Sequence, residues 1–105
     1  MPKKYRLTGE EIKNLSGKRL HGRLFSFLVA PITASGPKCA VVVSKKTAAK
    51  AVERNKIKRR TRNLLAKHLP GLQKRVALVL YAKREAKTAE FSELAQDIDA
   101  LFSKL

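Results

Sequence analysis

The middle of this chain carries a dense concentration of positive charge. Residues 38–75 contain thirteen Lys and Arg side chains and one acidic residue, Glu53, so their net charge of +12 is three quarters of the +16 of the 105-residue chain. The same stretch contains Val, Ile and Leu at regular intervals, which a disordered basic tail lacks. We therefore expect it to fold, with its basic side chains on a surface suited to a polyanion.

Most of this stretch has the periodicity of an α-helix, which we expect from about residue 47 to residue 69. Pro70 and Gly71 would end it. At 3.6 residues per turn, Lys and Arg dominate the circumference outside a single face. That mostly apolar face collects Ile57, Thr61, Leu64, Leu65 and His68.

One edge of the predicted helix lies beside its apolar face and combines several basic side chains with an asparagine. Like charges four residues apart disfavour an isolated helix, and a solvated helix would more often interleave Glu. Arg and Lys suit phosphate, and Asn can read a sugar or a base edge. We therefore predict a nucleic-acid interface rather than a merely solvated face. Its residues are Arg54, Asn55, Lys58, Arg59 and Arg62.

Shorter elements precede the basic helix. A capping box that begins at Thr8 (T-G-E-E) predicts a short helix over residues 9–16. Alternating apolar side chains predict strands over 22–30 and 38–45. We expect these two strands to pair as an antiparallel hairpin.

One more strand and one more helix are predicted after the basic helix. Residues 75–82 are apolar on both faces, which is typical of a central strand. Thr88 is expected to cap a final helix in which Phe and Leu recur at helical spacing, with its acidic residues on a solvated face. The order α-β-β-α-β-α indicates the α+β class, with a single small domain (residues 1–105) in which helices pack on a small mixed sheet.

Composition narrows the class of protein further. Cys39 is the only cysteine and His21 and His68 are the only histidines, so an internal disulfide is excluded and a built-in metal centre is not expected. The longest apolar run, Val76–Ala82, is far shorter than the roughly 20 residues of a membrane span. The N-terminus turns polar where a signal peptide would be apolar. We expect a cytoplasmic protein with no membrane partner.

A few isolated residues allow both a structural and a functional interpretation. Phe25 and Phe27 could stack on bases, although core packing is favoured. His21 lies in a basic neighbourhood and could contact RNA. Cys39 is most simply a small buried strand residue, because no partner is positioned to make it a nucleophile.

The basic helix also carries a recognisable motif. V-S-K-K (43–46) precedes A-V-E-R-N-K-I-K-R-R-T-R (51–62), which resembles the signature R-N-x-x-K-R-x-x-R of the bacterial ribonuclease P protein subunit. The five residues of the predicted interface match it position by position. Y-R-L (5–7), R-L-F (23–25) and L-P-G (69–71) match in the family's order, so the resemblance covers nearly the whole chain.

The resemblance implies a subunit of an endoribonuclease, a hydrolase. In this family a small protein joins a large catalytic RNA, and together they remove the 5′ leader of precursor tRNA to give the mature 5′ end. The RNA with its Mg²⁺ carries the catalysis, so we expect no catalytic side chain, no metal ligand and no cofactor bound by the protein alone. The resemblance also implies a ribosomal protein S5 domain 2-like fold with a left-handed βαβ crossover, where the general rule favours a right-handed one.

The resemblance assigns residues to two contact surfaces, one for the catalytic RNA and one for the leader. The charge pattern adds further residues to the RNA-binding surface. Base stacking on aromatics is worth roughly 1–3 kcal/mol per base, and the family often has aromatics where this chain has aliphatic residues. We therefore expect more aliphatic leader contacts here, or a neighbouring residue that substitutes. The RNA-binding set is Ser44, Lys45, Lys46, Arg54, Asn55, Lys58, Arg59 and Arg62, with Tyr5, Arg6, Lys56, Arg60 and Lys67 as possible additional contacts. The possible leader cleft contains Ile12, Leu15, Ser26 and Leu28.

Two other functions remain open at this point. A ribosomal or general RNA-binding protein would bind RNA without preferring ribonuclease P RNA. A stand-alone nuclease would need clustered carboxylates for a two-metal site. The basic half of the chain contains only Glu53, which argues against the nuclease.

Overall fold

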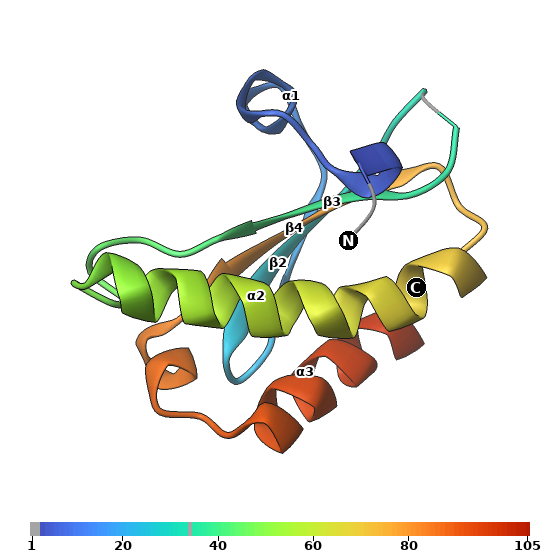
Figure 1. Ribbon diagram of the computed structural model, residues 1–105. Helices are drawn as coiled ribbons and strands as arrows, with labels where there is room; N and C mark the ends of the chain where they lie inside the picture. Colours follow the sequence, from blue (N-terminus) through green and yellow to red (C-terminus); the bar gives the residue numbers. More distant parts are fainter. Residues whose placement is uncertain (1–2, 34) are drawn as a thin grey trace.

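The computed structural model describes residues 3–33 and 35–105 and shows two long helices side by side on one face of a four-stranded sheet (Figure 1). Short 3-10 turns (η) punctuate the chain between these elements. In chain order the elements are η1 (Lys3–Tyr5), α1 (Gly9–Lys13), β1 (Lys18–His21), β2 (Phe25–Pro31), β3 (Lys38–Val42), α2 (Ala51–His68), η2 (Leu69–Gly71), β4 (Val76–Ala82), η3 (Arg84–Lys87) and α3 (Phe91–Ser103).

The sheet has the order β1-β2-β4-β3, and this confirms the predicted α+β class with a small mixed sheet. β2 is antiparallel to both β1 and β4, whereas β3 is parallel to β4. The predicted hairpin between 22–30 and 38–45 is wrong, because β4 lies between β2 and β3. β4 is apolar on both faces, as is typical of a central strand. It pairs with β2 along one edge and with β3 along the other. β3, α2 and β4 therefore form the crossover unit.

The N-terminal part differs most from the prediction. α1 ends at Lys13 rather than Ser16, although the Thr8 capping box is present as predicted. A further strand, β1, follows it and was not predicted. Its sequence, KRLH, is mostly exposed and lacks apolar alternation, as edge strands often do.

The core lies between the sheet and the two long helices. Phe25 and Phe27 of β2 point into it, as favoured by the sequence, and pack with Leu65 of α2 and Ile98 of α3. Successive side chains of a strand point to opposite faces of the sheet, so every second side chain points away from α2 and α3. On that opposite face, the strand register places His21, Ser26 and Tyr81 in one row across the strands.

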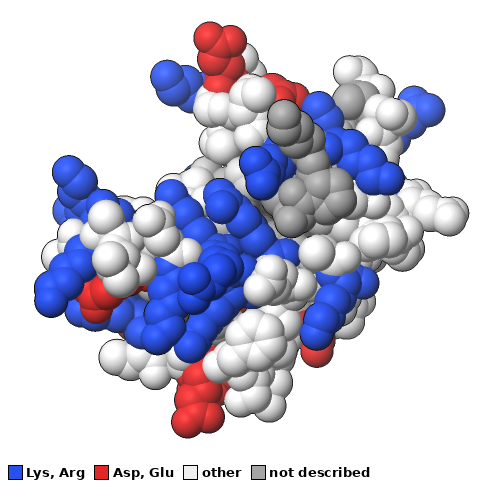
Figure 2. All heavy atoms as spheres, in the orientation of Figure 1, with Lys and Arg blue, Asp and Glu red and all other residues white. Residues whose placement is uncertain are grey.

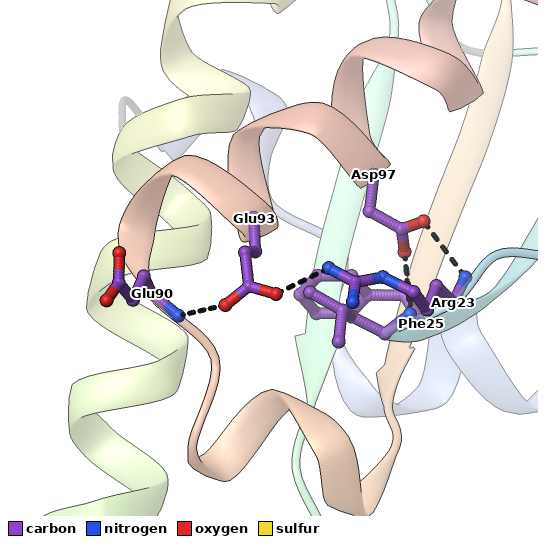
Figure 3. A network of polar contacts seen from close by, with 6 residues as sticks. Arg23, Phe25, Glu90, Glu93 and Asp97 are labelled. Atoms are coloured by element: carbon purple, nitrogen blue, oxygen red, sulfur yellow. Dashed lines mark hydrogen bonds and ion pairs between the residues drawn. The ribbon is translucent and has the colours of Figure 1, made fainter.

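Asp97 of α3 fixes the turn between β1 and β2 (Figure 3). Its carboxylate accepts hydrogen bonds from the backbone N–H groups of Arg23, Leu24 and Phe25, at 3.0, 3.1 and 3.1 Å. A Cβ on Gly22 would lie 2.6 Å from the same carboxylate oxygens, so the turn needs glycine there. This turn delays the start of β2 to Phe25.

The acidic residues of the last helix are only partly the solvated face that we expected, because Glu90 and Asp99 are exposed but Glu93, Asp97 and Asp99 have partners within the chain. Glu93 accepts from the Arg23 guanidinium at 2.7 Å, and Asp99 pairs with the His68 imidazole at 2.7 Å. The helix cap also differs from the prediction. Glu90, not Thr88, is the N-cap residue, in a capping box with Glu93.

Cys39 lies in the core, as the sequence indicated. Burial raises the pKa of its thiol to about 12, so the group stays protonated at neutral pH and is a poor nucleophile. Among residues 3–33 and 35–105, no helix has the length and apolar character needed to cross a bilayer.

Candidate RNA-binding site

The basic edge of α2, defined as Arg54, Asn55, Lys58, Arg59 and Arg62, forms the centre of the candidate site. Figure 2 shows Lys and Arg side chains gathered over this helix. Asn55 and Arg59 are exposed, whereas Lys58 and Arg62 are half-buried. Within the described part of the chain, no carboxylate lies within ion-pair distance of any Lys or Arg of α2. The edge therefore presents uncompensated charge from a rigid helix.

Arg54 differs from the rest of the edge because the fold already uses its guanidinium. The group donates to the backbone carbonyls of Ala48 and Ala49, at 3.0 and 2.7 Å. These bonds hold the chain that enters α2. Arg54 thus orients the start of the helix, and its remaining donors are left for another partner.

The loop between β3 and α2 brings Ser44, Lys45 and Lys46 next to the basic edge, all three exposed. The Ser44 hydroxyl lies 3.2 Å from that of Thr47, and the Thr47 hydroxyl donates to the Ala82 carbonyl at 3.0 Å. The loop is thereby tied to the end of β4. Thr47 belongs to this turn rather than to the helix, which begins at Ala51 instead of 47.

The N-terminus of α2 adds to the positive field at the same place. Its N-cap residue, Lys50, makes no side-chain capping bond. The first N–H groups of α2 therefore have no side-chain cap from Lys50, and the positive end of the helix dipole lies at the end of α2 that follows the loop with Lys45 and Lys46.

The possible additional contacts are scattered around this centre. Arg6, Lys56 and Lys67 are exposed and Arg60 is half-buried, whereas Tyr5 is only 9% exposed and packs in the core. Lys56 and Arg60 line a small crevice of about 90 Å³ on the opposite side of α2, where Glu53 pairs with Lys87 at 3.3 Å.

The four residues proposed for the leader cleft do not share one groove. Leu15 lines an open groove of about 560 Å³ with Pro31 and Ile32. Ile12 is half-buried on α1. Ser26 lies toward the other end of β2, half-buried, and Leu28 between them is only 7% exposed. The groove at Leu15 therefore lies at the Pro31 end of β2, whereas Ser26 lies near the other end of this strand.

Two residues on this face were missed by sequence reasoning. The Arg19 guanidinium carbon lies 5.2 Å from the centre of the Tyr81 ring, a cation–π contact between β1 and β4. Tyr81 was read as part of a double-sided apolar strand. Strand parity, which puts it on the same face as Val79, was the signal that could have identified it.

Comparisons with known proteins agree with one another. The family model described as Ribonuclease P matches residues 1–105. A ribonuclease P protein component from Picosynechococcus sp. is 31% identical, covering 96% of this chain and 90% of that protein. One from Acidothermus cellulolyticus is 33% identical, covering 100% of this chain and 91% of that one.

Solved structures match the fold. The RNase P protein of Staphylococcus aureus superposes with a TM-score of 0.84 at 21% identity, covering 94% of this chain and 93% of that one. The RNase P protein of Thermotoga maritima gives 0.80 at 21% identity, with 95% and 96% covered. The chain belongs to the ribonuclease P family, as the protein component of a tRNA-processing endoribonuclease.

Proposed function

We propose that the basic edge of α2 and the adjoining loop bind ribonuclease P RNA, while the sheet face opposite α2 and α3 receives the 5′ leader of precursor tRNA. Family membership implies association with ribonuclease P RNA, and the surface that makes the contact is our inference. In this proposal the assembled enzyme removes the leader in a Mg²⁺-dependent reaction and yields the mature tRNA 5′ end.

The observation that carries the proposal is that, among the residues the structure describes, no Lys or Arg of α2 has a carboxylate partner. Lys58 and Arg62 stand one turn apart, with the same sign. Each such pair costs an isolated helix a few tenths of a kcal/mol. Phosphates of a bound RNA would relieve this repulsion and accept the Arg and Lys donors.

Mg²⁺ is placed with the RNA in this proposal. In the described parts, 3–33 and 35–105, no group of three or more His, Cys, Asp or Glu side chains is arranged to hold a metal ion. The carboxylates of Glu93, Asp97 and Asp99 on α3 already bind Arg23, the β1–β2 turn and His68. The chain's own residues therefore contribute binding and orientation, and we assign none of them to bond cleavage.

Reconstitution tests the proposal directly. Adding the chain to ribonuclease P RNA should lower the Mg²⁺ concentration at which precursor tRNA is cleaved, because the basic edge neutralises phosphates that otherwise require cations. Cleavage is followed at matched RNA concentration with and without the chain. An identical Mg²⁺ dependence in both reactions would refute the proposal.

The two alternative functions predict different outcomes in two control experiments. A general RNA-binding protein would bind ribosomal RNA as tightly as ribonuclease P RNA. A stand-alone nuclease would cleave precursor tRNA with no RNA subunit present. Competition binding with ribosomal RNA and a protein-only reaction are therefore the two controls.

A further inference from the structure

The face of the sheet turned away from α2 and α3 carries a row of polar and aromatic side chains at one end. The strand register places His21 of β1 beside Ser26 of β2, and Ser26 beside Tyr81 of β4. Val42 of β3 is the partner of Tyr81 on its other side. Side chains opposite one another in a ladder share a face, so these four form one continuous strip.

The strip differs from the rest of its face. The next row contains Leu28 and Val79, which are buried, and only Arg19 at its β1 end is exposed. In the strip, by contrast, His21 is exposed and Ser26 and Tyr81 are half-buried. Neither α2 nor α3 lies over this face (Figure 1).

Tyr81 has an environment unlike that of the aromatics in the core. Phe25 and Phe27 are covered by the helices, whereas the Tyr81 ring has the Arg19 guanidinium over it, 5.2 Å from its centre. The His21 Nδ1 and the Ser26 hydroxyl lie 3.4 Å apart next to it. A flat ring, a planar cation and two hydrogen-bonding groups are what a nucleobase needs: a stacking surface, and donors and acceptors for its edge.

The strip is also continuous with the basic surface. β3 and β4 are parallel, so Ser44–Lys46 leave β3 at the same end of the sheet as Tyr81. The Thr47 hydroxyl bonds the Ala82 carbonyl and holds that loop against β4. A single strand of RNA whose phosphates contact Lys45 and Lys46 would therefore approach this face at the end of the sheet where Tyr81 lies.

We propose that Tyr81, with the Arg19 guanidinium over its ring, forms a stacking site for an unpaired base of the precursor tRNA leader, and that His21 and Ser26 contact the edge of that base. The proposal rests on the proposed function and deepens it, because it supplies an aromatic side chain for a leader surface whose other candidates, Ile12, Leu15, Ser26 and Leu28, include none. Tyr81 acts in substrate affinity and has no part in bond cleavage.

The test compares two substitutions at one position in the reconstituted holoenzyme. Tyr81→Leu removes the ring and keeps an apolar strand residue, while Tyr81→Phe keeps the ring and removes only the hydroxyl. Affinity is measured for precursor tRNA with a single-stranded leader and for the same tRNA without one. Tyr81→Leu should weaken leader-dependent binding by about 5-fold to 150-fold, the range for loss of one stacked base. Tyr81→Phe should retain most of it, and leaderless tRNA should bind all three proteins equally.

A spectroscopic readout locates the stack without depending on cleavage. 2-Aminopurine is placed at each leader position in turn, and its fluorescence is quenched when the base stacks. One position should be quenched with the wild type and with Tyr81→Phe but not with Tyr81→Leu. Arg19→Gln, on the edge strand, should reduce the quenching at that position and provides a second variant if Tyr81→Leu fails to fold.

The outcomes separate this inference from the proposed function. If the wild-type chain lowers the Mg²⁺ requirement but Tyr81→Leu binds leader-bearing and leaderless tRNA with the wild-type ratio, the stacking site is overturned and the function stands. If the wild-type chain has no effect on cleavage or on leader binding, the proposed function itself fails. An equal loss of affinity for both substrates in the leucine variant also overturns the stacking site.

Discussion

The two long helices pack on the same face of the sheet, yet they differ in whether their charged side chains have partners within the chain. On α3, Glu93, Asp97 and Asp99 each have a partner within the chain, at 2.7 to 3.0 Å. On α2, the basic edge has no carboxylate partner in the part of the chain that the structure describes. Charges that are paired internally stabilise the fold, whereas charges left unpaired on a rigid helix are available to another molecule. Substitutions on the two helices should therefore affect different properties.

The largest effect on stability is expected inside α2. Leu65 is 0% exposed, and Leu65→Ala should lower the free energy of unfolding by about 2–5 kcal/mol because it leaves a cavity. Val52, on the same helix, is 78% exposed, so Val52→Ala should change it by no more than about 0.5 kcal/mol. Urea denaturation of both variants measures the contrast, and equal effects would contradict the assigned orientation of α2.

The next effect is expected on α3. Asp97→Ala leaves three backbone donors of the β1–β2 turn without their carboxylate and should cost about 1–3 kcal/mol of unfolding free energy. Asp99→Ala removes an exposed pair with His68 and should cost at most about 1 kcal/mol. Thermal or urea unfolding compares them. A loss at Asp97 no greater than at Asp99 would mean that the turn does not depend on this carboxylate.

The basic edge should show the reverse pattern, with function affected and stability unchanged. Arg59→Ala should reduce the slope of log affinity against log salt for ribonuclease P RNA by about 0.7–0.9, the value for one lost phosphate contact. Lys104→Ala removes the same charge from the end of α3 and should leave the slope unaltered. Filter binding across a salt series measures both. Matching slopes for Arg59→Ala and the wild type would show that this side chain does not touch phosphate.

The smallest effect concerns pH and the start of α3. The backbone N–H of Glu90, and then the Arg23 guanidinium, hold the pKa of Glu93 below its ordinary value of 4.5. A carboxyl with a lowered pKa in the folded state contributes stability above its unfolded pKa and loses it as the pH falls through the folded pKa. Glu93→Gln should therefore be less stable than the wild type at neutral pH, and the difference should shrink below pH 4.5. Urea midpoints across this range measure it, and a constant difference would contradict the assignment.

The prediction from sequence was most accurate for long elements with strong periodicity. The α2 helix was confirmed except for its start, which is Ala51 rather than residue 47. The apolar face of Ile57, Thr61, Leu64 and Leu65 and the central position of β4 were also confirmed. These features depend on patterns within one element. Periodicity reports which side of an element is buried, and that information is local.

Features that depend on distant partners were not predictable in this way. Asp97 accepts from the Arg23 N–H and fixes the β1–β2 turn, but the two residues are 74 positions apart, so no local pattern predicts this contact. β1 is a short, charged edge strand whose only signal is its pairing with β2. The false hairpin arose because neighbours in sequence were assumed to be neighbours in the sheet.

The sequence by itself determined the basic helix, its motif and the family that the motif indicates, because all of these are written in consecutive residues. Only the tertiary structure decided which charges are used within the chain. In the folded chain, Arg54 donates to the backbone carbonyls of Ala48 and Ala49, and Asp97 accepts from backbone N–H groups of the β1–β2 turn. The tertiary structure also placed the Arg19 guanidinium over the Tyr81 ring, on a face away from the long helices. The physical reason is that hydrogen bonds, ion pairs and ring contacts are short-ranged, so their partners are known only when the chain has folded.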